Sequence, residues 1–150
     1  MKPVKRILLV EDDAMDIELI LKSLTEHIPA DAVFVARDGV DALDYLYRRG
    51  SFAQRPADNP AMILLDLKMP RLNGLQVLRQ LKTDEQLQMI PVVALTSSRE
   101  TSDLEECYRL GINAYVVKPV RFAEFAEAVK QIGVFWAKIN EPPPDTIPKE

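Results

Sequence analysis

The sequence predicts an α/β protein in which a five-stranded parallel sheet carries helices on both faces. Two observations support this fold class. Five short apolar runs alternate with segments whose apolar residues recur at helical spacing. The runs are almost continuously apolar, which is typical of strands buried on both faces of a parallel sheet. Because 150 residues is about the length of one ordinary domain, we expect a single unit.

The first two strand-helix units precede a loop. We expect these elements in order: strand 6–10, a helix up to Pro29, strand 32–36 and a helix at about 41–49. The first helix is amphipathic, with apolar residues at three- and four-residue spacing: Ile17, Ile20, Leu21, Leu24 and Ile28. The turn residues Asp38-Gly39 introduce the second helix. Residues 50–60 carry two prolines and no periodicity, which predicts a surface loop.

The third and fourth units follow this loop. We expect strand 61–65, a helix at about 75–83, strand 90–95 and a helix at about 101–110. Asn73-Gly74 marks the turn before the first of these helices. Gly111 fits the left-handed position that often ends a helix, so the second one stops there.

The fifth unit and a tail complete the chain. Strand 114–117 stops at Lys118-Pro119, and the final helix starts near Arg121. Its apolar residues trace one stripe that reaches the expected helix end: Phe122, Phe125, Val129, Ile132, Trp136 and Ile139. Four prolines among the last residues predict an extended or disordered tail. We therefore expect one domain over residues 1–139 and a tail over 140–150, without an effector or DNA-binding domain.

Composition and charge exclude several classes of function. No stretch approaches the roughly 20 apolar residues that span a bilayer, and no secretory signal is recognisable. Nineteen basic against 23 acidic residues give a net charge of −4, which argues against nucleic acid as the main partner. One cysteine, Cys107, allows no internal disulfide or CxxC site, and the one histidine, His27, is interpreted as a solvated helix-end residue. We expect a cytoplasmic protein whose chemistry rests on carboxylates, hydroxyls and lysines.

Polar side chains follow four of the five expected strands. Glu11 and Asp12 come after the first strand, Asp66 after the third, Thr96 after the fourth and Lys118 after the fifth. The carboxyl ends of parallel strands share one edge of the sheet, and ligands of open α/β sheets bind there. The sequence therefore predicts that one pocket gathers these side chains.

Three carboxylates without a histidine or cysteine beside them form an oxygen-rich site with strong mutual repulsion. A hard divalent cation of the magnesium type suits such a site, and Lys118 adds a fixed positive charge. This combination fits phosphoryl transfer to an ionised aspartate. Asp66 is the best candidate acceptor because it stands alone, whereas Glu11 and Asp12 form a pair suited to metal. Neither a Walker loop nor GxGxxG is present, so we expect a donor other than bound ATP.

In their order and spacing, these residues resemble the receiver domain of two-component response regulators. The resemblance covers about residues 5–138 and is carried by four motifs: the acidic pair within residues 8–13, Asp66 within 64–70, Thr96 after 92–95, and Lys118-Pro119. It implies a flavodoxin-like, doubly wound fold with the strand order 2-1-3-4-5.

The resemblance also implies how the acceptor and the metal are arranged. Asp66 would accept phosphate from a phosphohistidine on a sensor histidine kinase. The protein would be no enzyme beyond its own phosphorylation and dephosphorylation. Asp12 would bind Mg²⁺ directly, Glu11 through water or as a supporting carboxylate, and Lys68 through its backbone carbonyl.

The remaining family roles concern the phosphoryl oxygens and the conformational switch. Thr96 and Lys118 would contact the phosphoryl oxygens. Thr96 and the aromatic Tyr115 would change position together on phosphorylation. The Lys118-Pro119 peptide bond is often cis in this family, an isomer accessible mainly before proline.

A narrower resemblance is to stand-alone receivers that partner phytochrome-type sensor kinases. It rests on the loop before the third strand, Leu95-Thr96-Ser97-Ser98, Asn113-Ala114-Tyr115 and Phe135-Trp136. The resemblance implies a homodimer built through the side formed by helix 4, strand 5 and helix 5. Independently, Val134 and Phe135 lie off the apolar stripe of the last helix and are candidates for a partner surface. The alternative is that these two residues cover the end of the core or contact the tail.

Three other functions are compatible with parts of this pattern. A phosphorelay shuttle would pass the phosphate on to a histidine phosphotransfer protein. A phosphorylation-independent binding module would retain the acidic pocket as structure. A haloacid-dehalogenase-like phosphatase would need DxDxT or DxDxV after the first strand, which Glu11-Asp12-Asp13-Ala14-Met15 does not supply.

Overall fold

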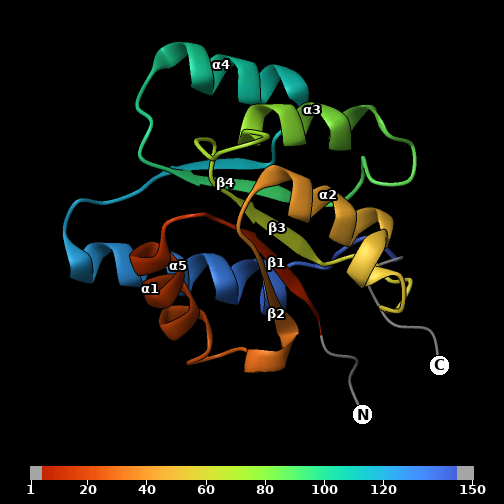
Figure 1. The fold of residues 1–150 in the computed structure, drawn as a ribbon. Helices are drawn as coiled ribbons and strands as arrows, with labels where there is room; N and C mark the ends of the chain where they lie inside the picture. Colours follow the sequence, from red (N-terminus) through yellow and green to blue (C-terminus); the bar gives the residue numbers. More distant parts are fainter. Residues whose placement is uncertain (1–4, 145–150) are drawn as a thin grey trace.

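Five parallel strands form one sheet in the computed structural model, which describes residues 5–144 (Figure 1). The strands are β1 (Ile7–Val10), β2 (Val33–Ala36), β3 (Met62–Leu65), β4 (Val92–Thr96) and β5 (Ala114–Val117). Their order is β2-β1-β3-β4-β5, and every neighbouring pair is parallel. The predicted flavodoxin-like order 2-1-3-4-5 is therefore confirmed.

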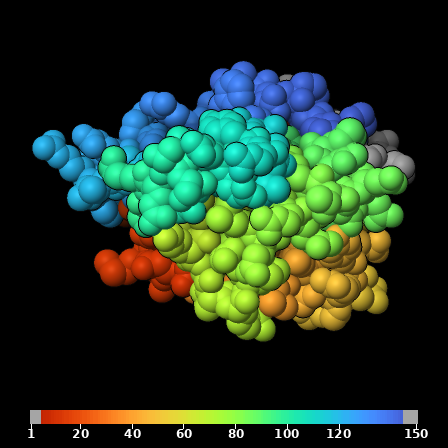
Figure 2. Space-filling view, turned by 90° about the horizontal axis from the view of Figure 1, so that it is seen from above, coloured from red at the N-terminus to blue at the C-terminus, as the bar shows by residue number. Residues whose placement is uncertain are grey.

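Helices cover both faces of the sheet. They are α1 (Ala14–Leu24), α2 (Gly39–Tyr47), α3 (Gly74–Thr83), α4 (Thr101–Leu110) and α5 (Phe122–Val134). α1 and α5 pack together on one face, and α2, α3 and α4 lie on the other (Figure 1). Figure 2 looks down on this second face, where α3 lies between α2 and α4. Within residues 5–144, no helix has the length and apolar character that crossing a membrane requires.

The strands are almost entirely apolar because each contributes side chains to two cores. Side chains alternate along a strand. In β1, Leu8 and Val10 therefore face α2 and α3, while Ile7 and Leu9 face α1 and α5. All four of these side chains are fully buried. Burial of a leucine or isoleucine contributes roughly 1.5–3 kcal/mol, so both helical layers are held firmly to the sheet.

Side-chain caps decide where three of the helices begin. Asp13 and Asp38 accept hydrogen bonds from the backbone N–H of Asp16 and Asp41, each at 2.9 Å, at the starts of α1 and α2. Asn73 and Gln76 form a reciprocal capping box at the start of α3. α2 consequently begins two residues before the predicted position. It also ends earlier, because Arg48 adopts a left-handed backbone with φ of 58°.

The end of α5 differs from the single predicted helix. The last turn, Phe135–Ile139, is a π-helix, and the N–H of Asn140 donates to the carbonyl of Phe135 at 2.6 Å. The wider turn rotates the residues after Val134 relative to the α-helical stripe. Ile139 is therefore 66% exposed and not buried with the stripe. Phe122 is 69% exposed as well, because it stands at the first position of the helix.

Arg55 joins the predicted loop over residues 50–60 to the end of α2. Arg55 donates to the carbonyl oxygens of Tyr45 at 2.6 Å and Leu46 at 3.2 Å, near the end of α2. Its guanidinium also lies over the Tyr45 ring, 4.3 Å from the centroid. The loop is thus an ordered part of the fold.

The predicted tail is described only as far as Pro144. Lys5 Nζ donates to the carbonyl of Asn140 at 3.1 Å, and Pro142 is buried. Residues 145–150 lie outside the described part, so the extended or disordered tail stays a prediction.

Cys107 provides a probe of the core below α4. Its side chain is fully buried, and burial raises the pKa of the thiol to about 11, with Asp103 and Glu106 adding to the effect. We expect the native protein to react with an aromatic disulfide reagent at pH 8 at least roughly 100-fold more slowly than an ordinary thiol. Reaction in denaturant supplies the control. Native labelling at the rate of a free thiol would contradict this burial.

Candidate functional site

Three carboxylates converge at the carboxyl edge of the sheet. Glu11 and Asp12 follow β1, and Asp66 follows the neighbouring strand β3, whose last residue Leu65 pairs with Val10. One oxygen from each carboxylate lies within 4.8 Å of the others. Glu11 and Asp66 are buried, and Asp12 is exposed. Carboxylate oxygens are the donors that a hard divalent cation such as Mg²⁺ prefers, so this group fits such an ion.

The backbone fixes the position of Asp66. Its N–H donates to the carbonyl of Val10 at 3.0 Å, which continues the ladder one residue past the strand. The backbone N–H of Lys68 lies 3.5 Å from Asp66 Oδ1. Gly74, at the start of α3, donates to the carbonyl of Leu67 at 2.9 Å and packs against this segment. The carboxylate therefore projects from a rigid strand end.

Glu11 is engaged through both oxygens. Oε2 accepts from the backbone N–H groups of Asp12 at 3.0 Å and Asp13 at 3.3 Å, and Oε1 accepts from Lys118 Nζ at 2.5 Å. Burial raises the pKa of Glu11 to about 7 against the opposing effect of Lys118, and the charge of Asp66 adds to the rise. The negative charge on Glu11 thus depends on its cationic neighbour.

Lys118 is the cation at the centre of the site. Its Nζ lies 2.5 Å from Glu11, 2.8 Å from Asp16 and 3.5 Å from Asp66. Burial alone would lower the pKa of Lys118, but the hydrogen bonds to Asp16 and Glu11 and the charge of Asp66 outweigh it and hold the pKa above its usual value. The lysine therefore stays charged among these carboxylates.

Asp16 is a member of this cluster that sequence reasoning missed. The periodicity of α1 placed it on the polar face of the helix, which is the usual place for a solvated aspartate. A usable signal was its position in the first helical turn after the acidic loop. That turn starts at the same edge of the sheet as Glu11 and Asp12.

Thr96 and Tyr115 are joined through the backbone of Ser98. Thr96 is fully buried, and its Oγ1 accepts from the N–H of Ser98 at 3.3 Å. The hydroxyl of Tyr115 donates to the carbonyl of Ser98 at 3.1 Å, and Ser98 Oγ donates to Asp103 in α4 at 2.5 Å. The two residues predicted to move together thus share one loop residue, which in turn contacts α4.

The Lys118-Pro119 peptide bond does not adopt the cis form that the resemblance suggested. Every peptide bond in the described part of the chain is trans. The trans isomer is favoured before proline by about 0.5–1 kcal/mol, which makes it the default where the surroundings do not select cis.

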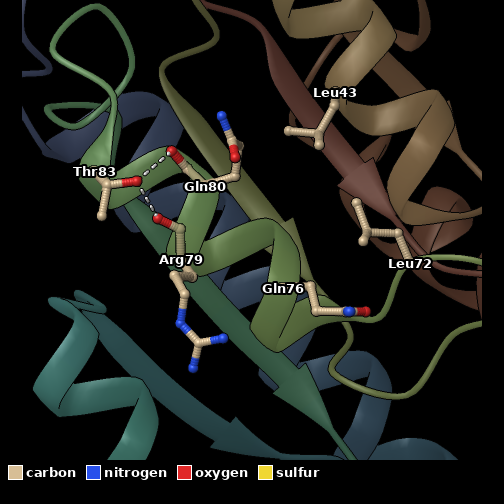
Figure 3. A pocket seen from close by; sticks show the side chains of 6 residues that line it. All are labelled: Leu43, Leu72, Gln76, Arg79, Gln80 and Thr83. Atoms are coloured by element: carbon tan, nitrogen blue, oxygen red, sulfur yellow. Dashed lines mark hydrogen bonds between the residues drawn. The ribbon is translucent and has the colours of Figure 1, made fainter.

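Two hollows lie apart from the acidic cluster. One, of about 410 Å³, lies between α2 and α3 and is lined by Leu43, Leu72, Gln76, Arg79, Gln80 and Thr83 (Figure 3). Thr83 Oγ1 donates to the backbone carbonyls of Arg79 and Gln80, so its hydroxyl is satisfied locally (Figure 3). The other, of about 500 Å³, lies beside β2 and is lined in part by Phe34, Phe52 and Arg55. The side chains that the sequence predicted for the site lie instead at the carboxyl edge of the sheet.

The sequence family follows from a comparison with known domains. Residues 7–130 match the response regulator receiver domain. The chain belongs to this family. Receiver domains are signalling proteins of two-component systems that partner histidine kinases. The receiver resemblance in the sequence rested on Glu11, Asp12, Asp66, Thr96 and Lys118.

Three relatives place this receiver within the family. The response regulator Rcp1 of Synechocystis sp. is 35% identical over 134 residues, which cover 89% of this chain and 90% of the relative. The bacteriophytochrome response regulator RtBRR is 54% identical, with a TM-score of 0.72 over 95% of this chain and 86% of that structure. The phosphorylated cyanobacterial phytochrome response regulator RcpA is 37% identical, with a TM-score of 0.87 over 93% and 99% of the two chains.

These relatives agree with the narrower resemblance to stand-alone receivers with phytochrome links. A structure of Rcp1 holds Mn²⁺, and its TM-score against this chain is 0.85 at 34% identity, covering 93% of this chain and 99% of that one. The divalent ion in this relative is consistent with a cation site at Glu11, Asp12 and Asp66 in this chain.

Proposed function

We propose that this receiver accepts a phosphoryl group from a sensor histidine kinase onto Asp66 and signals through protein contacts. The observation that carries the proposal is the convergence of Glu11, Asp12 and Asp66 with Lys118 at one edge of the sheet. Asp66 is the acceptor because its carboxylate is held by a strand end and stands beside the cation. Glu11 is already engaged through both oxygens, so it supports the site.

In the transfer step, an Asp66 oxygen attacks phosphorus as the bond from phosphorus to the kinase imidazole nitrogen breaks. The imidazole nitrogen leaves with the electron pair of that bond. Lys118 and the Thr96 hydroxyl then face the phosphoryl oxygens and offset their charge. The side chains of Glu11, Asp12 and Asp66 and the backbone carbonyl of Lys68 would hold Mg²⁺, which when bound neutralises charge on the transferring group.

The partner kinase is proposed to be of the phytochrome type, in the cytoplasm. The support is the 54% identity to a structure named as a bacteriophytochrome response regulator and the 37% identity to a phytochrome response regulator. The receiver domain is proposed to cover residues 1–139, followed by a separate tail over residues 140–150.

The output surface is proposed to be the side formed by α4, β5 and α5, including a homodimer contact. β5 is an edge strand, and α4 exposes Leu104 and Tyr108. Of the two predicted surface residues, Val134 at the end of α5 is half-buried, and Phe135 at the start of the π-helical turn is 45% exposed. The contacts of Ser98 with Tyr115 and Asp103 offer a route from the acidic site to this side.

Incubation with radiolabelled acetyl phosphate tests the proposed chemistry. We expect incorporation in millimolar Mg²⁺ that is lost when the metal is chelated, because the single charge of Lys118 does not offset three clustered carboxylates and an incoming phosphoryl group. The label should be released by hydroxylamine and by alkali, as an acyl phosphate is. Failure to label in Mg²⁺, or a label stable to alkali, would contradict the proposal and favour a phosphorylation-independent binding module.

A further inference from the structure

Three carboxylates share the single ammonium group of Lys118. An ammonium has three N–H donors, and N–H···O bonds fall between about 2.7 and 3.2 Å. Glu11 and Asp16 accept two of these bonds, at 2.5 and 2.8 Å. Asp66 Oδ2, at 3.5 Å, lies beyond that range. The resting lysine is thus held more closely by Glu11 and Asp16 than by the acceptor.

Asp16 is held in place by the start of α1. Its backbone N–H donates to the capping side chain of Asp13 at 2.9 Å, which fixes the helical turn that carries it. Its carboxylate is 30% exposed, whereas that of Glu11 is 1% exposed. Asp16 therefore contacts Lys118 from the rim of the site, outside the group of three carboxylates that fits a cation.

We infer that Asp16 is a positioning residue that tethers Lys118 at the rim and so weakens the hold of Lys118 on the phosphoryl group. This inference rests on the function proposed above. A phosphoryl group on Asp66 needs an N–H of Lys118, and its oxygens carry negative charge. Asp16 opposes that state because its hydrogen bond holds Lys118 Nζ at the rim, 2.8 Å from Asp16 and 3.5 Å from Asp66 Oδ2. Asp16 thereby sets the balance between the resting and the phosphorylated site.

Beryllofluoride, a stable mimic of the phosphoryl group, tests the tether without turnover. We expect Asp16→Asn to bind beryllofluoride in Mg²⁺ about three- to tenfold more tightly than the native protein, since the amide does not hold the ammonium as a carboxylate does. The ¹⁹F resonances of the bound group should also shift. Asp16→Glu restores the carboxylate and should return the affinity to within about twofold of native.

Glu18→Gln is the matched control. It removes the same charge from an exposed position two residues further along α1, roughly 200° around the helix from Asp16. The affinity of this variant for beryllofluoride should stay within about twofold of the native value. An equal gain in Glu18→Gln would overturn the inference, because the effect would then be one of overall charge.

A double-substitution cycle separates the tether from a structural effect. In a Lys118→Gln background, Asp16→Asn should no longer change the affinity, since the group that Asp16 holds is gone. A gain that persists in this background would overturn the inference. If the native protein binds the mimic and Asp16→Asn binds it with the same affinity, the inference is also overturned. Failure of the native protein to bind the mimic in Mg²⁺ would overturn the proposed function as well as the tether.

Discussion

The Asp66→Asn protein should incorporate at least about 100-fold less phosphate from acetyl phosphate than the native protein. The amide has the shape of the carboxylate but lacks the anionic oxygen that attacks phosphorus. Asp66 is also the member of the cluster that is buried, held by a strand end and 3.5 Å from Lys118. Phosphate incorporation per mole of protein, followed by mapping of the labelled peptide, measures the effect.

Asp31→Asn is the control for this substitution. Asp31 is exposed and precedes β2, at the opposite edge of the sheet from Asp66. The same change of charge there should leave incorporation within about twofold of native. Persistent labelling of Asp66→Asn would mean that another side chain accepts the phosphate, and the assignment of Asp66 would then be wrong.

Gly74→Ala should destabilise the protein by about 3 kcal/mol and displace the acceptor. A Cβ at this position would lie 2.2 Å from the carbonyl oxygen of Asp66 and 2.6 Å from the Cα of Leu67. These are backbone atoms at the end of the central strand, so relief of the clash must move the segment that carries the acceptor. Urea unfolding measures the loss of stability, and acetyl phosphate labelling measures the displacement.

Gly39→Ala separates the two effects of Gly74→Ala. Its Cβ would lie 2.2 Å from the carbonyl oxygen of Leu72, so it should also destabilise the fold, but it does not touch the backbone of Asp66. We expect folded Gly39→Ala protein to label nearly as well as native, and folded Gly74→Ala protein to label at least about tenfold less. A change in unfolding free energy below about 0.5 kcal/mol in Gly74→Ala would contradict the close packing.

The elements of the fold follow largely from local sequence. Continuous apolar runs predicted the five strands because each strand contributes side chains to both cores, and the predicted α4 matches the observed helix. Where the prediction missed, the cause was an interaction that periodicity does not encode. The cap at Asp38 moved the start of α2, and the π-helical turn at Phe135–Ile139 rotated Ile139 out of the apolar stripe.

The acidic site, like the fold, was predictable from the sequence only in part. Parallel strands bring their carboxyl ends to one edge, so the sequence could bring together Glu11, Asp12 and Asp66 from strand positions alone. The link through Ser98 depends on how the loop after β4 meets β5 and α4, which involves residues up to 17 positions apart in the chain. No local pattern reports such a contact.

By itself, the sequence determined the α/β class, the edge at which the polar residues gather and the family motifs, because these follow from burial, periodicity and the order of residue types. Only the tertiary structure decided how the charge of Lys118 is shared. Asp16 and Lys118 are 102 positions apart in the chain, yet they lie 2.8 Å apart in space. An ion pair of this kind exists only once α1 has packed onto the sheet and β5 has joined its edge.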